Sequence, residues 1–244
     1  MTVTILITRP EPEASRFAET LRADHGTEAC VLRSPLMRIE PAGALPQMCR
    51  DETLIFTSRH GVAGFCRLTA RRDLPCYAVG DATAQALRDA GMAATACGGD
   101  ADALVRRIAQ DGARGPFLHL RGTHVAADIA GALRAAGHEA RDAIIYAQTP
   151  QPLTEAARAV LSGSDPVILP LMSPRSGQLF FAQAEAPAAP LFIAAISANA
   201  ARVVPDGAAR MVRVAPSPDA TAIRKLLRDL AKSAKRLEGR KRAQ

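Results

Sequence analysis

Short apolar runs alternate regularly with longer segments of helical periodicity along almost the whole chain. We expect strands at Val3–Ile7, Ala29–Leu32, Leu54–Phe56, Cys76–Val79, Ala93–Ala96, Phe117–Leu120, Ala143–Tyr146, Val167–Leu171, Leu191–Ile196 and Met211–Val214. Between them lie helical segments, among them Glu13–Asp24, Ala82–Ala90, Asp102–Gln110, Val125–Ala136, Leu153–Leu161 and Asp219–Ala234. This alternation predicts the α/β class, with parallel sheets covered by helices.

Two proline-rich stretches, residues 33–46 and 146–152, interrupt the alternation. Each follows an expected strand, and an inserted domain needs two crossings of the chain. The 244 residues suffice for two modest domains. We therefore expect two flavodoxin-like α/β domains, one inserted in the other. Residues 38–145 would form the inserted domain, residues 1–35 and 148–235 the discontinuous one, and residues 236–244 a basic flexible tail.

The excess positive charge is concentrated at the C-terminal end. Of 31 Lys and Arg residues, nine lie from Arg224 onward, against two of the 24 Asp and Glu residues. The remaining 22 cations balance 22 anions, so the rest of the chain is neutral. This excludes a basic body of the nucleic-acid-binding kind, and 4% aromatic residues offer few platforms for base stacking. A nonspecific contact between the tail and a polyanion stays open.

Other classes of protein find little support in the sequence. No apolar run is long enough to span a membrane, and the first residues lack the pattern of a secretory signal. The five cysteines form no CxxC pair, so we expect reduced, mostly buried thiols in the cytoplasm. The five histidines are scattered without metal-ligand spacing, and we expect surface or capping roles for them. We expect a monomer that binds neither a membrane nor a specific nucleic acid.

The residues that follow the expected strands are the first candidates for a binding site, because ligands of open parallel sheets bind beyond the carboxyl ends of the strands. Helices that start there offer free backbone N–H groups and a positive dipole end, which suits carboxylate or phosphate. Any single serine or threonine is first explained as a helix cap, but the whole set predicts a polyanionic ligand. The candidates are Arg9, Thr57, Ser58, Arg59, Gly80, Thr83, Gly122, Ser173, Arg175, Ser197 and Asn199.

A faint internal repeat relates the two halves of the chain. The segment LIFTSRHGVAGF at residues 54–65 is similar to LPLMSPRSGQLF at residues 169–180. In both, an apolar strand leads to a serine, Ser58 or Ser173, then to an arginine and a helix. Two similar halves would each bring a strand-to-helix junction to the ligand.

Six segments carry a resemblance to a known family: ILITRP (5–10), IFTSRHGV (55–62), YAVGDATAQALRDAG (77–91), LHLRG (118–122), GHEARDAIIYAQT (137–149) and LMSPRSGQLF (171–180). In this order and spacing, the chain resembles the uroporphyrinogen-III synthase family to about Leu230. The resemblance implies two α/β domains joined by a two-stranded connection. It also implies an enzyme without a cofactor that cyclises hydroxymethylbilane to uroporphyrinogen III, with loss of water and inversion of ring D.

The resemblance further implies roles for particular residues. Tyr146 matches the family's tyrosine that is proposed to assist departure of the hydroxyl, and Thr83 matches a hydroxyl residue at the cleft. Ser58 and Ser173 match the two strand-end serines. Where the family often has Gly-Pro-Thr-Thr-Ala, this chain has SANAA at residues 197–201. A threonine of the cleft is therefore missing, and either the asparagine replaces it or its contact is dispensable.

A second hypothesis stays open beside the enzyme. The chain would then be a non-catalytic two-domain binder of small anionic ligands with the same fold. A member of the family that has kept the fold without the activity is one form of this hypothesis, and the missing threonine keeps it open.

Overall fold

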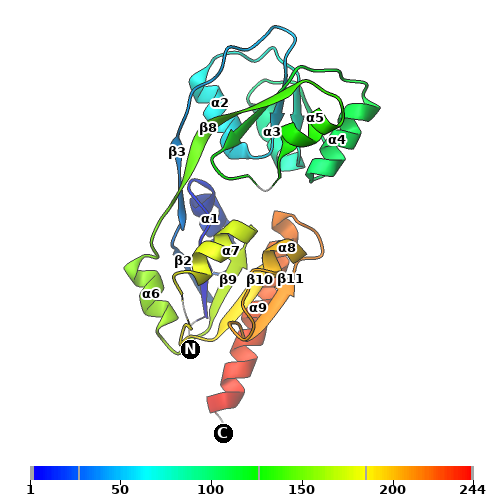
Figure 1. The fold of residues 1–244 in the computed structure, drawn as a ribbon. Helices are drawn as coiled ribbons and strands as arrows, with labels where there is room; N and C mark the ends of the chain where they lie inside the picture. Colours follow the sequence, from blue (N-terminus) through cyan, green and yellow to red (C-terminus); the bar gives the residue numbers. More distant parts are fainter. Residues whose placement is uncertain (1–2, 27, 126, 185, 243–244) are drawn as a thin grey trace. The chain divides into compact units, whose positions relative to one another are not determined.

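The computed structural model describes residues 3–26, 28–125, 127–184 and 186–242, with side chains as far as Arg236. The chain divides into two compact units (Figure 1). Unit 1 comprises Met1–Arg38 and Pro150–Gln244, and unit 2 comprises Ile39–Thr149. Each unit has its own sheet, covered by helices. The expected fold class is confirmed.

Unit 1 contains a five-stranded sheet in the order β11-β10-β9-β1-β2, and each neighbouring pair is parallel. Its strands are β1 (Val3–Ile7), β2 (Ala29–Arg33), β9 (Val167–Leu171), β10 (Leu191–Ala195) and β11 (Met211–Val214). Its helices are α1 (Glu13–His25), α6 (Glu155–Leu161), α7 (Pro174–Phe181), α8 (Ala198–Ala201) and α9 (Ala220–Arg242).

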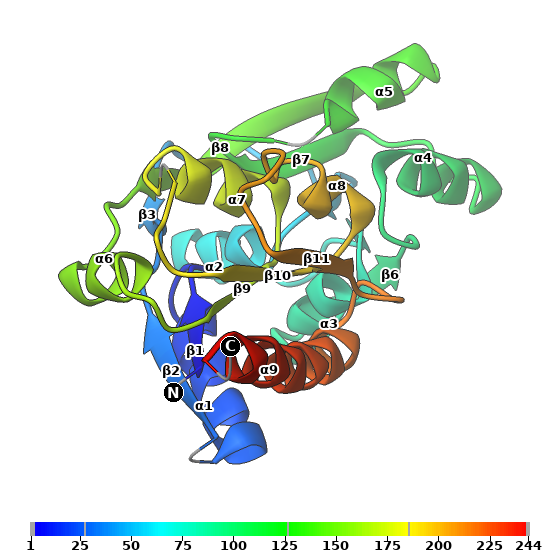
Figure 2. The same ribbon diagram turned by 90° about the horizontal axis from the view of Figure 1, so that it is seen from below.

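The three central strands of unit 1, β1, β9 and β10, are buried along their whole length because helices cover both faces of the sheet, whereas the edge strands β2 and β11 are partly exposed. Successive side chains of a strand point to opposite faces. Ile5 therefore packs in the core with α1 and α9, whereas Leu6 packs with residues of α6, α7 and α8. Figure 2 shows α9 on one face of this sheet and α7 and α8 on the other. Because the helices cover the two faces, the carboxyl edge of the sheet is formed by the junctions at which a strand leads into a helix.

Unit 2 contains a six-stranded sheet in the order β3-β8-β7-β4-β5-β6. The pairs β7–β8, β4–β7, β4–β5 and β5–β6 are parallel. Its strands are β3 (Met37–Pro41), β4 (Thr53–Phe56), β5 (Cys76–Ala78), β6 (Ala94–Ala96), β7 (Phe117–Gly122) and β8 (Ala140–Pro150). Its helices are α2 (Arg59–Leu68), α3 (Asp81–Asp89), α4 (Ala101–Gln110) and α5 (Ile129–Ala135).

The two proline-rich stretches, which we expected to be crossings between the domains, contain strand residues. Strands β3 and β8 are neighbours in the sheet, and both cross the boundary between the units. The N–H of Gln151 donates to the carbonyl of Leu36 at 2.8 Å just beyond them. Prolines stand at the last position of each strand, which a strand end tolerates. The implied two-stranded connection is therefore present, although β3 was not among the expected strands and β8 is longer than expected.

Two helix boundaries differ from expectation by more than two residues. The helix expected from Val125 begins at Ile129, where the side chain of Asp128 caps it by accepting from the N–H of Gly131 at 2.8 Å; residue 126 lies outside the described residues. The last helix was expected to end at Ala234 but continues to Arg242. Most of the segment expected as a tail is thus helical.

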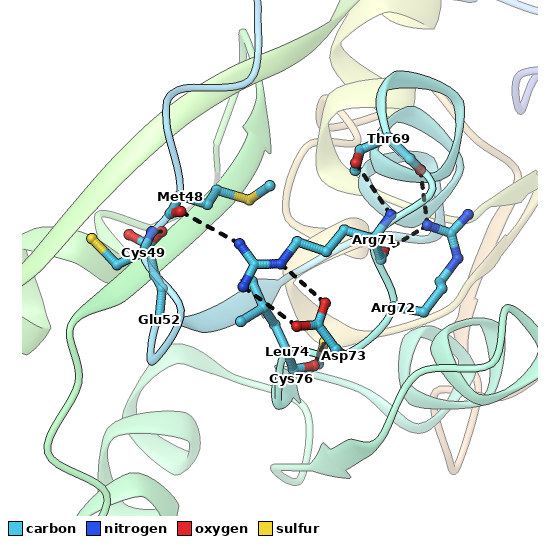
Figure 3. A network of polar contacts seen from close by, with 9 residues as sticks. All are labelled: Met48, Cys49, Glu52, Thr69, Arg71, Arg72, Asp73, Leu74 and Cys76. Carbon is cyan, nitrogen blue, oxygen red and sulfur yellow. Dashed lines mark hydrogen bonds and ion pairs between the residues drawn. The ribbon is translucent and has the colours of Figure 1, made fainter.

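Polar contacts fix the loop between β3 and β4 (Figure 3). Arg71 donates to the carbonyl of Met48 at 3.4 Å, and the N–H of Cys49 donates to the carboxylate of Glu52 at 3.3 Å. Glu52 is 1% exposed and also accepts from Arg141 of β8, at 2.8 and 3.0 Å. The loop is thereby fastened to the first residues of β8.

Candidate active site

The predicted site residues lie at the carboxyl edges of the two sheets. In unit 2, Thr57, Ser58 and Arg59 follow β4, Gly80 and Thr83 follow β5, Gly122 ends β7, and Tyr146 lies in β8. In unit 1, Arg9 follows β1, Ser173 and Arg175 follow β9, and Ser197 and Asn199 follow β10. Parallel strands place all their carboxyl ends at one edge, so each unit gathers its own group of candidates.

The three strand-end serines are helix caps. Ser58 Oγ accepts from the N–H of His60 at 3.1 Å, Ser173 Oγ from Ser176 at 3.1 Å, and Ser197 Oγ from Ala200 at 3.3 Å. The capping role is therefore confirmed at all three positions. A hydroxyl that accepts in this way still has a proton to donate, so capping and ligand binding are compatible. Ligand binding by these serines stays a prediction.

Gly80 and Thr83 form the start of α3. Gly80 is the N-cap residue without a capping side chain, and a Cβ added there would meet no atom within 4 Å. The backbone N–H of Thr83 donates to the carbonyl of Gly80 at 3.0 Å, and the Thr83 side chain is buried. Open space at Gly80 lets a ligand approach the backbone closely at the positive end of the helix.

Unit 1 offers arginines and a buried hydroxyl at its edge. The guanidinium of Arg9 lies 5.8 Å from the ring centre of Phe17. Thr8 Oγ1 and Arg175 Nε are buried and have no hydrogen-bond partner within the described part of the chain. Thr8 directly follows β1, as the other candidates follow their strands. Because buried polar groups are normally paired, these two atoms are suitable contacts for a polar ligand.

His119 contradicts the expectation that the histidines lie at the surface or cap helices. It lies in β7 and is 2% exposed, and its Nε2 is 3.4 Å from Thr57 Oγ1. Burial lowers the pKa of His119 to about 4, so the ring is neutral near pH 7. A neutral imidazole beneath an exposed threonine hydroxyl can fix the orientation of that hydroxyl. His25 is also buried.

Tyr146 is the most enclosed of the polar candidates. It is 4% exposed and packs with Ile145 in the core beside α2 and α3. Its ring lies against Gly122 of β7, where an added Cβ would be 2.5 Å from Tyr146 Cε2. The ring of His60 lies at a centroid distance of 6.1 Å. The phenol is therefore held between the first turn of α2 and the end of β7.

The environment of Tyr146 keeps its phenol protonated. Burial raises the pKa of Tyr146 above its ordinary value of 10, while hydrogen bonds from the Ser58 side chain and the Gly122 backbone lower it in part. The net shift is upward, because desolvation of the phenolate outweighs these contacts. Tyr146 can thus donate a hydrogen bond across the neutral pH range. The structure brings Tyr146, Ser58 and Gly122 together, three residues that the sequence separates widely.

Within the described ranges, no group of three or more His, Cys, Asp or Glu side chains is arranged to hold a metal ion. None of the helices in those ranges is both long and apolar enough to cross a bilayer.

The fold and the site define a class: a two-unit α/β protein in which the carboxyl edge of each parallel sheet presents hydroxyls, arginines and helix N-termini. A crystal structure of uroporphyrinogen-III synthetase from Helicobacter pylori 26695 has this fold, with a TM-score of 0.68 and 17% identity over 94% of this chain and 100% of that one. A mutant uroporphyrinogen III synthase from the extremely thermophilic bacterium Thermus thermophilus is similar with a TM-score of 0.60 and 14% identity, over 96% and 100% of the two chains.

The sequence identifies the family within that class. The family described as "Uroporphyrinogen-III synthase HemD" matches residues 15–224. The chain belongs to the uroporphyrinogen-III synthase family, whose members are cyclising lyases of haem biosynthesis. A comparison with curated proteins found no match. The expected fold, enzyme class and pathway are confirmed.

Proposed function

We propose that this chain converts hydroxymethylbilane, a linear tetrapyrrole rich in carboxylates, into uroporphyrinogen III. The observation that carries this proposal is the protonated, buried phenol of Tyr146, held beside Ser58 at the carboxyl edge of the unit 2 sheet. A neutral donor in this setting suits a leaving hydroxyl better than a carboxylate substituent. The family membership supports the same reaction.

The step assigned to Tyr146 is departure of the substrate hydroxyl. The C–O bond breaks, its electron pair leaves with the oxygen, and Tyr146 Oη transfers its proton to that oxygen, so that water departs and a phenolate remains. The phenolate recovers a proton when the closing pyrrole ring loses one on regaining its aromaticity. The remaining cation is attacked by the substituted carbon of ring D, giving a spiro intermediate that leads to the inverted product. Thr83, whose side chain is buried in the first turn of α3, is the second catalytic candidate.

The other candidates would bind the carboxylates. The N-termini of α2, α3 and α7 present backbone N–H groups and a positive dipole end. Thr57, Ser58, Arg59, Gly80 and Gly122 serve in unit 2, and Arg9, Ser173, Arg175, Ser197 and Asn199 serve in unit 1. The substrate can close unaided to the type I isomer, so the enzyme's contribution is mainly to position the reacting carbon.

The product isomer tests the proposal. Hydroxymethylbilane is generated in situ, the protein is added, and the oxidised products are separated into types I and III beside a control without protein. We expect mainly type III. Only type I, formed at the spontaneous rate by a protein that circular dichroism shows to be folded, would refute the activity. That result would favour the non-catalytic binder of small anionic ligands.

We also propose that the enzyme acts as a cytoplasmic monomer without a cofactor. The five cysteines are free thiols, which are typical of a reducing compartment. The expectation that they are mostly buried is wrong, because only Cys76 and Cys97 are buried and Cys30 and Cys49 are exposed. Light scattering at several protein concentrations tests the monomer, and a cofactor would appear as an absorbing or dialysable component that activity requires.

A further inference from the structure

A register irregularity precedes Tyr146 in β8. Arg121 of β7 pairs with Ile144, but the next residue, Gly122, pairs with Tyr146, so Ile145 has no partner of its own in β7. Neighbouring residues of a regular strand point to opposite faces. Here Ile145 and Tyr146 both belong to the core on the side of α2 and α3. The bulge has therefore turned Tyr146 toward α2, as bulges near active sites commonly do.

Gly122 leaves the space that the turned ring occupies. A Cβ on Gly122 would lie 2.5 Å from Cε2, 2.7 Å from Cζ and 3.0 Å from Oη of Tyr146. Carbon atoms do not approach within such distances, so any side chain would displace the phenol. Gly122 is not among the residues with positive φ. Space, and not backbone conformation, is what requires glycine here.

Gly61 gives a weaker contact on the other side of the ring. A Cβ there would lie 3.8 Å from Tyr146 Cε1 and 3.1 Å from the carbonyl oxygen of Leu120. The close approach of α2 to β7 thus depends mainly on Gly61 and Leu120. The contact that bears directly on the hydroxyl end of Tyr146 is the one at Gly122.

We propose that Gly122 is a positioning residue, which seats the phenol of Tyr146 beside Ser58 so that its O–H points consistently at the leaving oxygen. Gly122 is also proposed above to bind substrate, and the two roles are compatible. Substrate binding by a glycine uses its backbone, which Gly122→Ala keeps, whereas the positioning role depends on the absence of a side chain. This inference rests on the proposed catalytic role of Tyr146. Its test therefore measures the environment of the Tyr146 phenol separately from turnover.

The composition of the chain permits a direct measurement. The protein contains two tyrosines and no tryptophan, so in a Tyr77→Phe background Tyr146 is the sole tyrosine. Its phenolate can then be titrated by ultraviolet absorbance. With Gly122 in place, the phenol titrates above its ordinary pKa of 10. In Gly122→Ala the displaced ring is expected to titrate closer to 10, with kcat lowered about a hundredfold and KM little changed.

A double-mutant cycle separates positioning from general damage. If Gly122 acts through the Tyr146 hydroxyl, Gly122→Ala has little further effect on kcat once Tyr146→Phe has removed that hydroxyl. Gly64→Ala is the matched control, because Gly64 lies in α2 and an added Cβ would be 3.4 Å from Ile145 Cδ1, an ordinary contact. We expect Gly64→Ala to leave both the titration and kcat unchanged.

The outcomes distinguish the two proposals. A Tyr146 titration that Gly122→Ala does not move overturns the positioning role. A shifted titration with unchanged kcat would support the positioning of the Tyr146 phenol by Gly122 but refute catalysis by Tyr146. If Gly122→Ala does not fold, Tyr146→Leu is added to remove the clashing ring. If the double variant folds, the clash between the Gly122 position and the Tyr146 ring is supported. If it does not fold, the positioning role is overturned.

Discussion

Replacing Tyr146 by phenylalanine removes one hydroxyl and keeps the ring that packs against Gly122 and Gly61. The fold should tolerate the change, because the ring of Tyr146 is buried in the core and loses no apolar contact. The Ser58 side chain and the Gly122 backbone lose a hydrogen-bond partner, which costs about 1 kcal/mol of unfolding free energy. Urea denaturation of the variant should therefore show a modest shift of the midpoint.

The effect on turnover should be larger than the effect on stability. Donation to a leaving oxygen by a positioned side chain typically contributes about a hundredfold or more. The substrate loses its hydroxyl readily without help, so we expect the lower end of that range, about a hundredfold in kcat or about 3 kcal/mol in the activation free energy. KM should change little, because the hydroxyl is assigned to the transition state and not to carboxylate binding.

The isomer assay measures this effect in two ways. Slower enzymatic closure leaves more substrate to close spontaneously, so the share of type I product should rise as the rate of type III formation falls. The wild-type rate should also stay level through neutral pH and fall only as the pH rises past the phenol's pKa, which burial raises above 10. A folded Tyr146→Phe variant with a rate within about twofold of wild type would remove the residue from the mechanism.

Two further predictions concern stability. The unfolded chain protonates His119 at its ordinary pKa of 6.5, but the folded protein does so only near 4, so stability is full above pH 6.5 and falls as the pH drops toward 4. This loss is at most about 3 kcal/mol; urea titrations should show it as the difference between wild type and His119→Gln, and equal pH slopes for the two would contradict it. Glu52→Gln weakens charge-assisted bonds to Arg141 and should cost about 1–3 kcal/mol, with urea unfolding at neutral pH as the measurement and an unchanged midpoint as the contrary result.

The elements that sequence predicts well are those that local composition determines. The strand Val3–Ile7 has the expected bounds because every residue is apolar or small enough to be buried and both faces of the sheet are covered. The caps at Ser58 and Ser173 were predictable for a similar reason, since a serine before a helix satisfies backbone N–H groups within the same segment. Neither case depends on a distant part of the chain.

The features that sequence reasoning missed depend on pairing partners. The bulge before Tyr146 arises from the register between β7 and β8, and no local pattern in β8 indicates it. His119 shares a face of β7 with Phe117, which packs with residues of α4 and α5, and the apolar pattern of β7 does not specify which helices cover that face. Strand β3 was missed because residues 33–46 are rich in proline, and its ladder exists only where β8 supplies the partner.

The segment at residues 197–201 shows which parts of this site can vary. Ser197 still caps α8, and Asn199 Oδ1 accepts from Arg202 at 3.0 Å, so the asparagine's carbonyl is engaged within its own helix. If ligand contacts at this edge come mainly from backbone N–H groups, the loss of a threonine hydroxyl there is tolerable. Gly122 does not tolerate a comparable change, because a single added methyl group there would overlap the ring of Tyr146. In an enzyme that works mainly by positioning, residues that hold the donor in place should be constrained more tightly than residues that merely enlarge the binding surface.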